Sequence, residues 1–189
     1  KIRNPKSGFT MSSINHKPIL NTLVAGSDLD AQTMEQFIGA VMDGAVDEVV
    51  VAAVLAALRA KGETGTEIAA AARAMRARAV PVEINQPERA VDTCGTGGDG
   101  AETINISTAA AIVAAAAGVA VAKHGNRSVS SRCGSADVLE AAGVHLDLDP
   151  GAMAELHNDV GIAFLFAPRL HPAMKAVMPV RRTLGVRTV

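Results

Sequence analysis

The sequence predicts a small all-helical domain followed by a larger α/β domain with a mainly parallel sheet. Two observations support this prediction. Apolar residues recur at helical spacing through residues 17–80. From residue 89, short apolar runs alternate with helix-forming stretches, which is typical of a parallel sheet with crossover helices. With 189 residues, of which 49% are hydrophobic, the chain is long enough to bury a substantial core.

Helix start and stop signals divide the first part of the chain. A helix is expected from an Asp30 cap to about Asp43, and a second from about Asp47 to Lys61. The stretch Thr64–Glu67 fits a capping box that opens a third helix. We therefore expect a helical domain over residues 14–80, joined later in the chain by helices within residues 168–186.

The α/β domain is expected over residues 81–167 and to continue beyond the end of this chain. Its predicted strands are residues 90–92, 119–122 and 162–166, and its predicted helices are residues 107–117, 135–142 and 150–159. In sheets of this kind, ligands bind at the carboxyl ends of the strands. The loops that follow the predicted strands are therefore the first places to look for a site.

Composition excludes several classes of function. The net charge of −1 gives no electrostatic reason to expect nucleic acid or an anionic membrane as a partner. Trp and Tyr are absent, so the usual base-stacking platforms are missing. The longest apolar stretch, Ala109–Ala122, is shorter than the roughly 20 residues that span a bilayer.

Two cysteines cannot form a disulfide framework, which favours a reduced, cytoplasmic protein. We expect Cys94 and Cys133 to be small buried or half-buried residues. Both ends of the chain look artificial. Residues 1–13 are interpreted as a tag or disordered start, with Met11 as a plausible native beginning, and the last residues stop without a terminating signal, which indicates a fragment.

A glycine loop after the first predicted strand favours an anion site. Four glycines follow Val91, and a cluster of hydroxyl and amide side chains then opens an alanine-rich helix. Backbone N–H groups at such a turn, together with the helix dipole, favour phosphate. The pattern is neither the Walker motif nor the dinucleotide fingerprint. Asn105, Ser107 and Thr108 can each donate to an oxyanion, and Ser107 or Asp99 can face a magnesium ion. The alternatives are a tight turn and, for Ser107, an ordinary helix cap.

A second polar loop, Lys123–Ser131, follows the second predicted strand. It gathers two cations, an amide and several hydroxyls, next to a further turn at Gly134–Ser135. We interpret it as a phosphate or pyrophosphate site in which Lys123 supplies a point charge, and a solvated surface loop is the alternative. His124 is either a general base, a donor to a substrate carbonyl or a structural residue. The other histidines show no metal-ligand spacing and are interpreted as ordinary.

These motifs resemble anthranilate phosphoribosyltransferases. The resemblance rests on the glycine loop Gly95–Asp99, on Asn105–Thr108, on Lys123–Ser131, and on residues 164–168 with His171–Met174. It extends from about Pro18 to the last residue. The loop Lys123–Ser131 is the most specific part, since the glycine loop also resembles that of pyrimidine nucleoside phosphorylases.

The resemblance implies a reaction and a fold. Such enzymes transfer the phosphoribosyl group of phosphoribosyl pyrophosphate to the amine of anthranilate, releasing pyrophosphate, in tryptophan biosynthesis. The fold implied is of the nucleoside phosphorylase/phosphoribosyltransferase type, only partly present in this chain. Mg²⁺ as cofactor and a homodimer formed through the helical domain are also implied, with no nucleic-acid or membrane partner.

The resemblance also implies site residues. Magnesium would touch Ser107, and anthranilate would meet Gly95, Asn126 and Arg181, with Arg181 near its carboxylate. No covalent nucleophile and no firm general base are assigned. The sugar pyrophosphate would contact Gly95, Gly98, Asp99, Thr103, Asn105, Ile106, Ser107, Thr108, Lys123, His124, Gly125, Asn126, Arg127, Ser128, Val129, Ser130, Ser131 and Ser135.

The resemblance is imperfect at two points, and two other functions stay open. An acidic Asp-Glu pair that would hold magnesium in the family is absent here, and Cys133 stands where a small residue, often serine, is expected. A nucleoside phosphorylase would show a Lys-His-Ser/Thr start to the glycine loop, whereas this chain has Asp-Thr-Cys before Gly95. A nucleic-acid-binding relative would need a basic groove, and the net charge of −1 argues against one.

Overall fold

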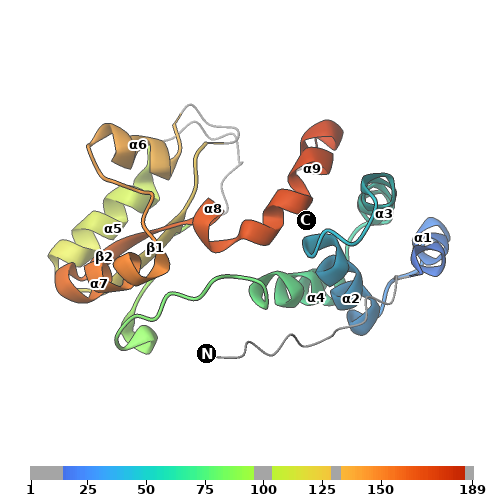
Figure 1. The fold of residues 1–189 in the computed structure, drawn as a ribbon, viewed down its shortest axis with the longest axis horizontal. Coiled ribbons are helices and arrows are strands. Elements are labelled where there is room, and N and C mark those ends of the chain that lie inside the picture. Colours follow the sequence, from blue (N-terminus) through green and yellow to red (C-terminus); the bar gives the residue numbers. More distant parts are fainter. Residues whose placement is uncertain (1–14, 96–103, 129–132, 186–189) are drawn as a thin grey trace, which may run out of the picture. The chain divides into compact units, whose positions relative to one another are not determined.

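The structure is a computed structural model that describes residues 15–95, 104–128 and 133–185. It divides into two compact units: the helical unit, which combines residues 1–77 with 175–189, and the α/β unit, residues 78–174. Figure 1 labels the elements of both. The expected start segment, residues 1–13, lies outside the described residues. The expected domain limits stay predictions, because compact units within one chain do not by themselves test independent folding.

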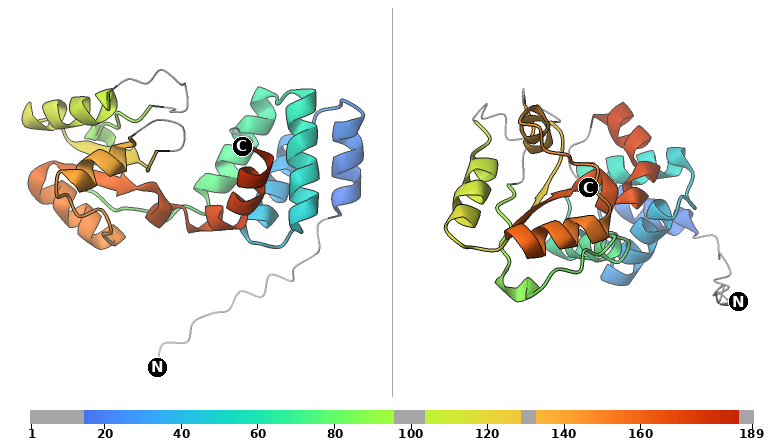
Figure 2. Two further views of the ribbon diagram at one scale, coloured as in Figure 1. Left: turned by 90° about the horizontal axis from the view of Figure 1, so that it is seen from above. Right: turned by 60° about the vertical axis from the view of Figure 1, so that its left-hand side comes forward.

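The helical unit is a bundle of α1 (His16–Val24), α2 (Ala31–Met42), α3 (Glu48–Lys61), α4 (Gly65–Arg76) and α9 (Met178–Leu184). Helix α2 packs against α4, and α3 packs against both α1 and α9. The arrangement is visible in Figure 2. Phe37, Val54 and Leu58 are fully buried in this unit. The apolar spacing predicted for α3 is therefore confirmed, with Val54 and Leu58 in the core. In α4 the expected apolar face is wrong, because Ile68 is 55% exposed and the helix buries Glu67, Ala70, Ala71 and Ala74.

The predicted helix starts are confirmed by their hydrogen bonds. The Asp30 carboxylate accepts from the backbone N–H of Thr33 at 2.8 Å, and the Asp47 carboxylate accepts from Val49 at 2.8 Å. At the start of α4, the Thr64 hydroxyl and the Glu67 carboxylate exchange hydrogen bonds with each other's backbone N–H groups. These bonds satisfy N–H groups that a helix leaves without partners in its first turn.

The α/β unit contains a short 3₁₀ turn (Pro87–Arg89), α5 (Ile106–Ala116), β1 (Val121–Gly125), α6 (Ser135–Ala141), α7 (Pro150–Val160), β2 (Ile162–Phe166) and α8 (Ala167–Leu170). A second 3₁₀ turn, Pro172–Ala176, leads back to the helical unit. Helix α5 packs against both strands, and α7 and α8 pack against β2. The alternation of strands and helices is the one predicted.

Strands β1 and β2 are parallel, with Val121 opposite Ile162 and Gly125 opposite Phe166. Val91 adds a parallel bridge to Val121. The strand expected over residues 90–92 is thus reduced to one residue. The reason is local: the N–H of Ala90 bonds to Pro87 in the 3₁₀ turn, and Asp92 already opens the glycine loop.

The second predicted strand was placed too early in the chain. We expected residues 119–122 as strand and a loop from Lys123 onward, but β1 includes Lys123, His124 and Gly125 because β2 supplies them with partners. Successive side chains of a strand alternate between its faces, so Lys123 shares a face with the buried Val121. No helix among the described residues is long and apolar enough to cross a membrane.

Candidate functional site

The carboxyl ends of the parallel strands bring the two predicted loops together. The glycine loop follows Val91, the polar loop follows β1, and α8 follows β2. Because the three segments run parallel, these connections leave the sheet at one edge. One carboxylate joins the first two: Asp92 Oδ1 accepts from the N–H of Cys94 at 2.8 Å and from the N–H of His124 at 3.2 Å.

Lys123 is the buried cation of this edge. Its residue is 3% exposed, and its Nζ donates to the Ser107 hydroxyl, in the first turn of α5, at 3.3 Å. Burial lowers the pKa of Lys123, although the nearby Asp92 acts in the opposite direction. A buried ammonium with a single hydroxyl partner among the described residues is poorly compensated. An anion bound at the start of α5 would supply the missing charge.

The start of α5 carries further polar groups with unused capacity. The Thr108 hydroxyl is buried and has no partner among the described residues. Asn105, the residue before the helix, makes no side-chain cap bond. The Thr93 hydroxyl donates to the backbone oxygen of Ser107 at 2.8 Å, which fastens the glycine loop to this turn. Ile106 has an exposed apolar side chain, so only its backbone can contact a polar ligand.

The described part of the polar loop is held by α6. The N–H groups of Ser128 and Gly134 both donate to Asp137 Oδ2, at 3.0 and 2.7 Å. The backbone oxygen of Asn126 accepts from the N–H of Ala136 at 3.1 Å and from the Ser135 hydroxyl at 3.2 Å. The loop is therefore attached to the first turn of α6.

Arg127 differs from Lys123 in having carboxylate partners. Its guanidinium donates to both oxygens of Glu140, at 2.6 and 2.8 Å, and to Asp137 at 3.3 Å. It also lies over the ring of Phe166, 5.8 Å from the centroid. The hydrogen bond to Glu140 is the main cause that raises the pKa of Arg127. The two cations of the loop are thus in different environments.

His124 faces a second histidine that sequence reasoning interpreted as ordinary. Its ring meets the ring of His171 edge to face, with 5.4 Å between centroids. The Nε2 of His124 is buried without a partner among the described residues. Burial lowers the pKa of His171, and the neighbouring His124 lowers it further. His171 follows α8, so its position after a predicted strand was the signal that was missed.

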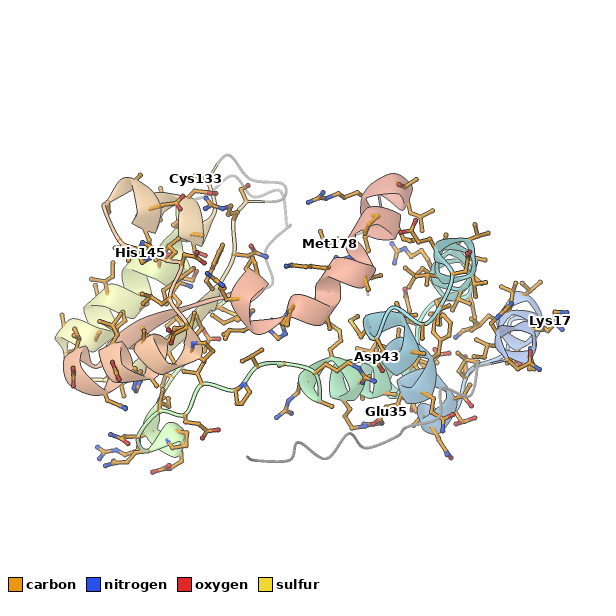
Figure 3. The ribbon with its side chains drawn as sticks, in the orientation of Figure 1. Lys17, Glu35, Asp43, Cys133, His145 and Met178 are labelled. Atoms are coloured by element: carbon orange, nitrogen blue, oxygen red, sulfur yellow. The ribbon has the colours of Figure 1, made fainter. Side chains whose placement is uncertain are left out.

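The expectation for the cysteines was wrong, because Cys94 and Cys133 are both exposed. Cys94 lies in the loop after the Val91 bridge. Cys133 lies just before α6 (Figure 3). Local desolvation and then the charge of Asp92 raise the pKa of Cys94. Its thiol is therefore not activated as a nucleophile.

Three of the remaining predicted residues lie in described segments, and the others do not. Arg181 lies on α9 of the helical unit, so its place beside anthranilate stays a prediction. Gly95 is exposed at the start of the glycine loop, and Gly125 ends β1. Gly98, Asp99, Thr103, Val129, Ser130 and Ser131 lie outside the described residues.

Comparison with known families decides the classification. A model of the glycosyl transferase family, a/b domain, matches residues 87–189, and a model of the family's helical bundle domain matches residues 17–79. The chain belongs to the glycosyl transferase family. The two matches agree with the predicted order, a helical part followed by an α/β part.

Within this family the chain is similar to anthranilate phosphoribosyltransferases. It is 53% identical over 174 residues to that of Chlorobium phaeovibrioides, covering 92% of this chain and 49% of the relative. It is 55% identical over 171 residues to that of Prosthecochloris aestuarii, covering 90% and 48%. The chain thus spans about half the length of the curated relatives it matches.

Solved structures give the same result. The crystal structure of anthranilate phosphoribosyltransferase from Thermus thermophilus matches with a TM-score of 0.82 at 49% identity, over 90% of this chain and 51% of that one. The Saccharomyces cerevisiae enzyme in complex with PRPP and Mg matches with a TM-score of 0.83 at 27% identity, over 94% and 53%. The fold predicted for this glycosyl transferase chain is confirmed.

A magnesium ion at this site would depend on oxygen atoms that the bound ligand supplies. The described residues contain no group of three or more His, Cys, Asp or Glu side chains that could hold a metal ion. Ser107 offers one oxygen, of the kind magnesium prefers, but the ammonium of Lys123 lies 3.3 Å from it. An ion there needs further oxygens of negative charge, which a pyrophosphate carries.

Proposed function

We propose that the full-length protein is an anthranilate phosphoribosyltransferase. It transfers the phosphoribosyl group of phosphoribosyl pyrophosphate to the amine of anthranilate and releases pyrophosphate. The carrying observation is the buried Lys123 beside Ser107, at the start of α5 and at the edge where the loops meet. Its support is the similarity to enzymes of that name, one of them solved with PRPP and Mg.

The charge of the site fits the leaving group. In the reaction, a bond forms between the amine nitrogen and the anomeric carbon, the bond from that carbon to the pyrophosphate oxygen breaks, and the amine loses a proton. Negative charge grows on the departing pyrophosphate while the sugar gains oxocarbenium character. Lys123 and the N-terminal turn of α5 stabilise that charge, and the loops place the amine. This chemistry needs no covalent nucleophile.

The proposed phosphoribosyl pyrophosphate contacts lie in both loops, except for Arg127, whose guanidinium is engaged by Glu140 and Asp137. The proposed anthranilate contacts are Gly95, Asn126 and Arg181. Arg181 would meet the carboxylate of anthranilate through its planar fork of donors. Among the residues given by the resemblance, we propose that Lys123 contributes charge to the phosphoribosyl site. Ser107 and Thr108 contribute hydroxyls there.

We propose Mg²⁺ as the cofactor, with Ser107 as one ligand. When bound, the ion would act as a Lewis acid that neutralises negative charge on the pyrophosphate oxygens. Ser107 would hold the ion through its hydroxyl oxygen, and Lys123 would bind the pyrophosphate through its ammonium. We also propose a cytoplasmic homodimer formed through the helical domain. Sedimentation of the full-length protein tests the dimer.

The assay that tests the function follows the fluorescence of anthranilate. Adding phosphoribosyl pyrophosphate and Mg²⁺ to the full-length protein should remove the fluorescence, and omitting either should preserve it. The chain contains no Trp or Tyr, so its own background is low. Persistence of the fluorescence with full-length, folded protein would refute the proposed function. The same assay on the chain of 189 residues measures how much of the activity this part retains.

A further inference from the structure

Asp137 occupies an unusual position in the α/β unit, because one of its oxygens accepts from two backbone amides, one within the polar loop and one just after it. Oδ2 accepts from Ser128 at 3.0 Å and from Gly134 at 2.7 Å, while Oδ1 accepts from Arg127 at 3.3 Å. The two amides are its main pKa influences, and both lower the pKa of Asp137. Asp137 belongs to none of the predicted binding residues.

The backbone passes so closely at this point that only glycine fits. A Cβ at Gly134 would lie 2.2 Å from the nitrogen of Ser128 and 2.6 Å from the carbonyl carbon of Arg127. Both of these are backbone atoms, which cannot move aside as a side chain can. The two amides therefore converge on one carboxylate oxygen because the two stretches of chain are in contact.

Arg127, one of the two cations of the loop, is bonded to α6, the helix that carries Asp137. Arg127 is bonded to Glu140 and Asp137 and covers Phe166. One guanidinium facing two carboxylates leaves a local charge of about −1, which does not attract a pyrophosphate. Lys123, by contrast, is buried with a hydroxyl as its partner. The two cations of the loop thus divide into one that can meet an anion and one that braces the chain.

We propose that Asp137 is a positioning residue for phosphoribosyl pyrophosphate binding, acting through the backbone of Asn126–Ser128, and that Arg127 belongs to the same brace and does not contact phosphate. The proposal rests on the proposed function. It assigns to the first turns of α6 the task of holding the segment that follows β1. Displacing that segment by an ångström costs affinity, because backbone donors act only in good geometry.

The test is steady-state kinetics on the full-length protein with the variant Asp137→Ala. We expect the KM for phosphoribosyl pyrophosphate to rise about tenfold or more, which corresponds to the loss of one well-made hydrogen bond. The kcat should change less than about threefold, since Asp137 touches no reacting group in this proposal. A purely structural role would lower the amount of active enzyme without this split.

Two further variants separate the brace from general damage. Asp137→Asn keeps an oxygen that can accept from both amides, so it should restore part of the affinity. Asp147→Asn removes the charge of another helix-flanking carboxylate, which pairs with Arg169 in the same unit, and should leave both KM values unchanged. Arg127→Ala should raise the KM for phosphoribosyl pyrophosphate less than Asp137→Ala does.

Amide hydrogen exchange keeps the proposal testable if Asp137→Ala fails to fold. In the ligand-free wild type, the amides of Ser128 and Gly134 should be protected, and in Asp137→Asn they should exchange faster. An unchanged KM for phosphoribosyl pyrophosphate in a folded Asp137→Ala, or a larger effect of Arg127→Ala, would overturn the proposal. If the wild type itself consumes no anthranilate, the proposed function fails instead.

Discussion

At the scale of single residues, the most consequential feature is the buried ammonium of Lys123. Its hydrogen-bond partner among the described residues is the neutral hydroxyl of Ser107, so the fold does not compensate its charge well. Such groups destabilise a fold while they serve a ligand. Function and stability are therefore expected to oppose each other at this position.

The substitution Lys123→Met tests this opposition. We expect the dissociation constant for phosphoribosyl pyrophosphate to rise roughly 10- to 100-fold, the range for a hydrogen bond to a charged group. The melting temperature should stay or rise, because an apolar side chain of similar length replaces a desolvated charge. Calorimetry and thermal unfolding measure the two quantities. Lys175→Met, at an exposed lysine, is the control.

The pH dependence of binding follows from the same lysine. Burial lowers its pKa below the ordinary 10.5, so the ammonium loses its proton at a lower pH than an exposed lysine does. Binding of phosphoribosyl pyrophosphate should therefore weaken as the pH rises, with a midpoint below 10.5. Titration by calorimetry in wild type and Lys123→Met checks this, and an equal pH dependence in both would contradict it.

Gly134 provides a second test at the residue scale. In Gly134→Ala the new Cβ would collide with backbone, so the loop must open and the KM for phosphoribosyl pyrophosphate should rise. Gly65→Ala is the matched control, since a Cβ at Gly65, in the first turn of α4, meets nothing within 4 Å. That control should keep its kinetics and gain up to about 1 kcal/mol of stability.

At the scale of elements, Glu67 ties the start of α4 to its neighbours. It is fully buried, and its carboxylate accepts from the backbone of Leu29, from Thr64 and from the ammonium of Lys61. Burial alone would raise the pKa of Glu67, but these hydrogen bonds lower it to about 2. The contacts join the end of α3, the cap of α4 and the segment before α2.

The variant Glu67→Gln should lower the free energy of unfolding by about 2 kcal/mol, because a neutral amide replaces a buried carboxylate that accepts from two backbone amides and from Lys61, while Lys61 keeps Asp28 as a partner. The folded-state pKa lies below the ordinary 4.5, so this stabilisation is complete above pH 4.5 and is lost as the pH falls toward 2. Denaturant unfolding between pH 7 and pH 3 measures it. Glu35→Gln, at the exposed pair with Arg73, should change stability by less than about 1 kcal/mol.

At the scale of the whole molecule, the chain exposes an apolar helix. Helix α5 contains no charged residue, yet Ile106, Ile112 and Val113 are 59%, 53% and 69% exposed. A helix that is apolar all round is typical of a position covered on every side. The chain spans about half the length of its relatives, and its exposed apolar surface is a liability for association in solution.

The variant Ile112→Lys should therefore reduce binding of the hydrophobic dye ANS and self-association of the chain of 189 residues. Ile68→Lys in α4 is a matched control, because Ile68 is 55% exposed and is the one large apolar residue of that helix that is exposed. Dye fluorescence and light scattering make the comparison. Equal effects of the two substitutions would show that α5 has no special part in association.

Much of the architecture was predictable because its signals are local. Caps such as Asp30 and the box at Thr64 lie within four residues of the amides they satisfy, and helical spacing needs no distant partner. The strand limits failed because pairing with β2 extends β1 to Gly125. The burial predicted for the two cysteines was wrong because the exposure of a loop residue depends on which other elements cover it. Asp92 and His171 were missed because both contact His124, which is distant from them in the sequence.

Sequence patterns alone predict the caps of α2, α3 and α4, the parallel α/β class and the two loops in which a phosphate site is sought. Tertiary structure alone decided which cation of the second loop is buried. Lys123 and Arg127 lie four residues apart with the same charge, but the register with β2 turns Lys123 inward, while the carboxylates of α6 engage Arg127. Charge and spacing cannot separate the two, because burial and ion pairing depend on elements that meet only after folding.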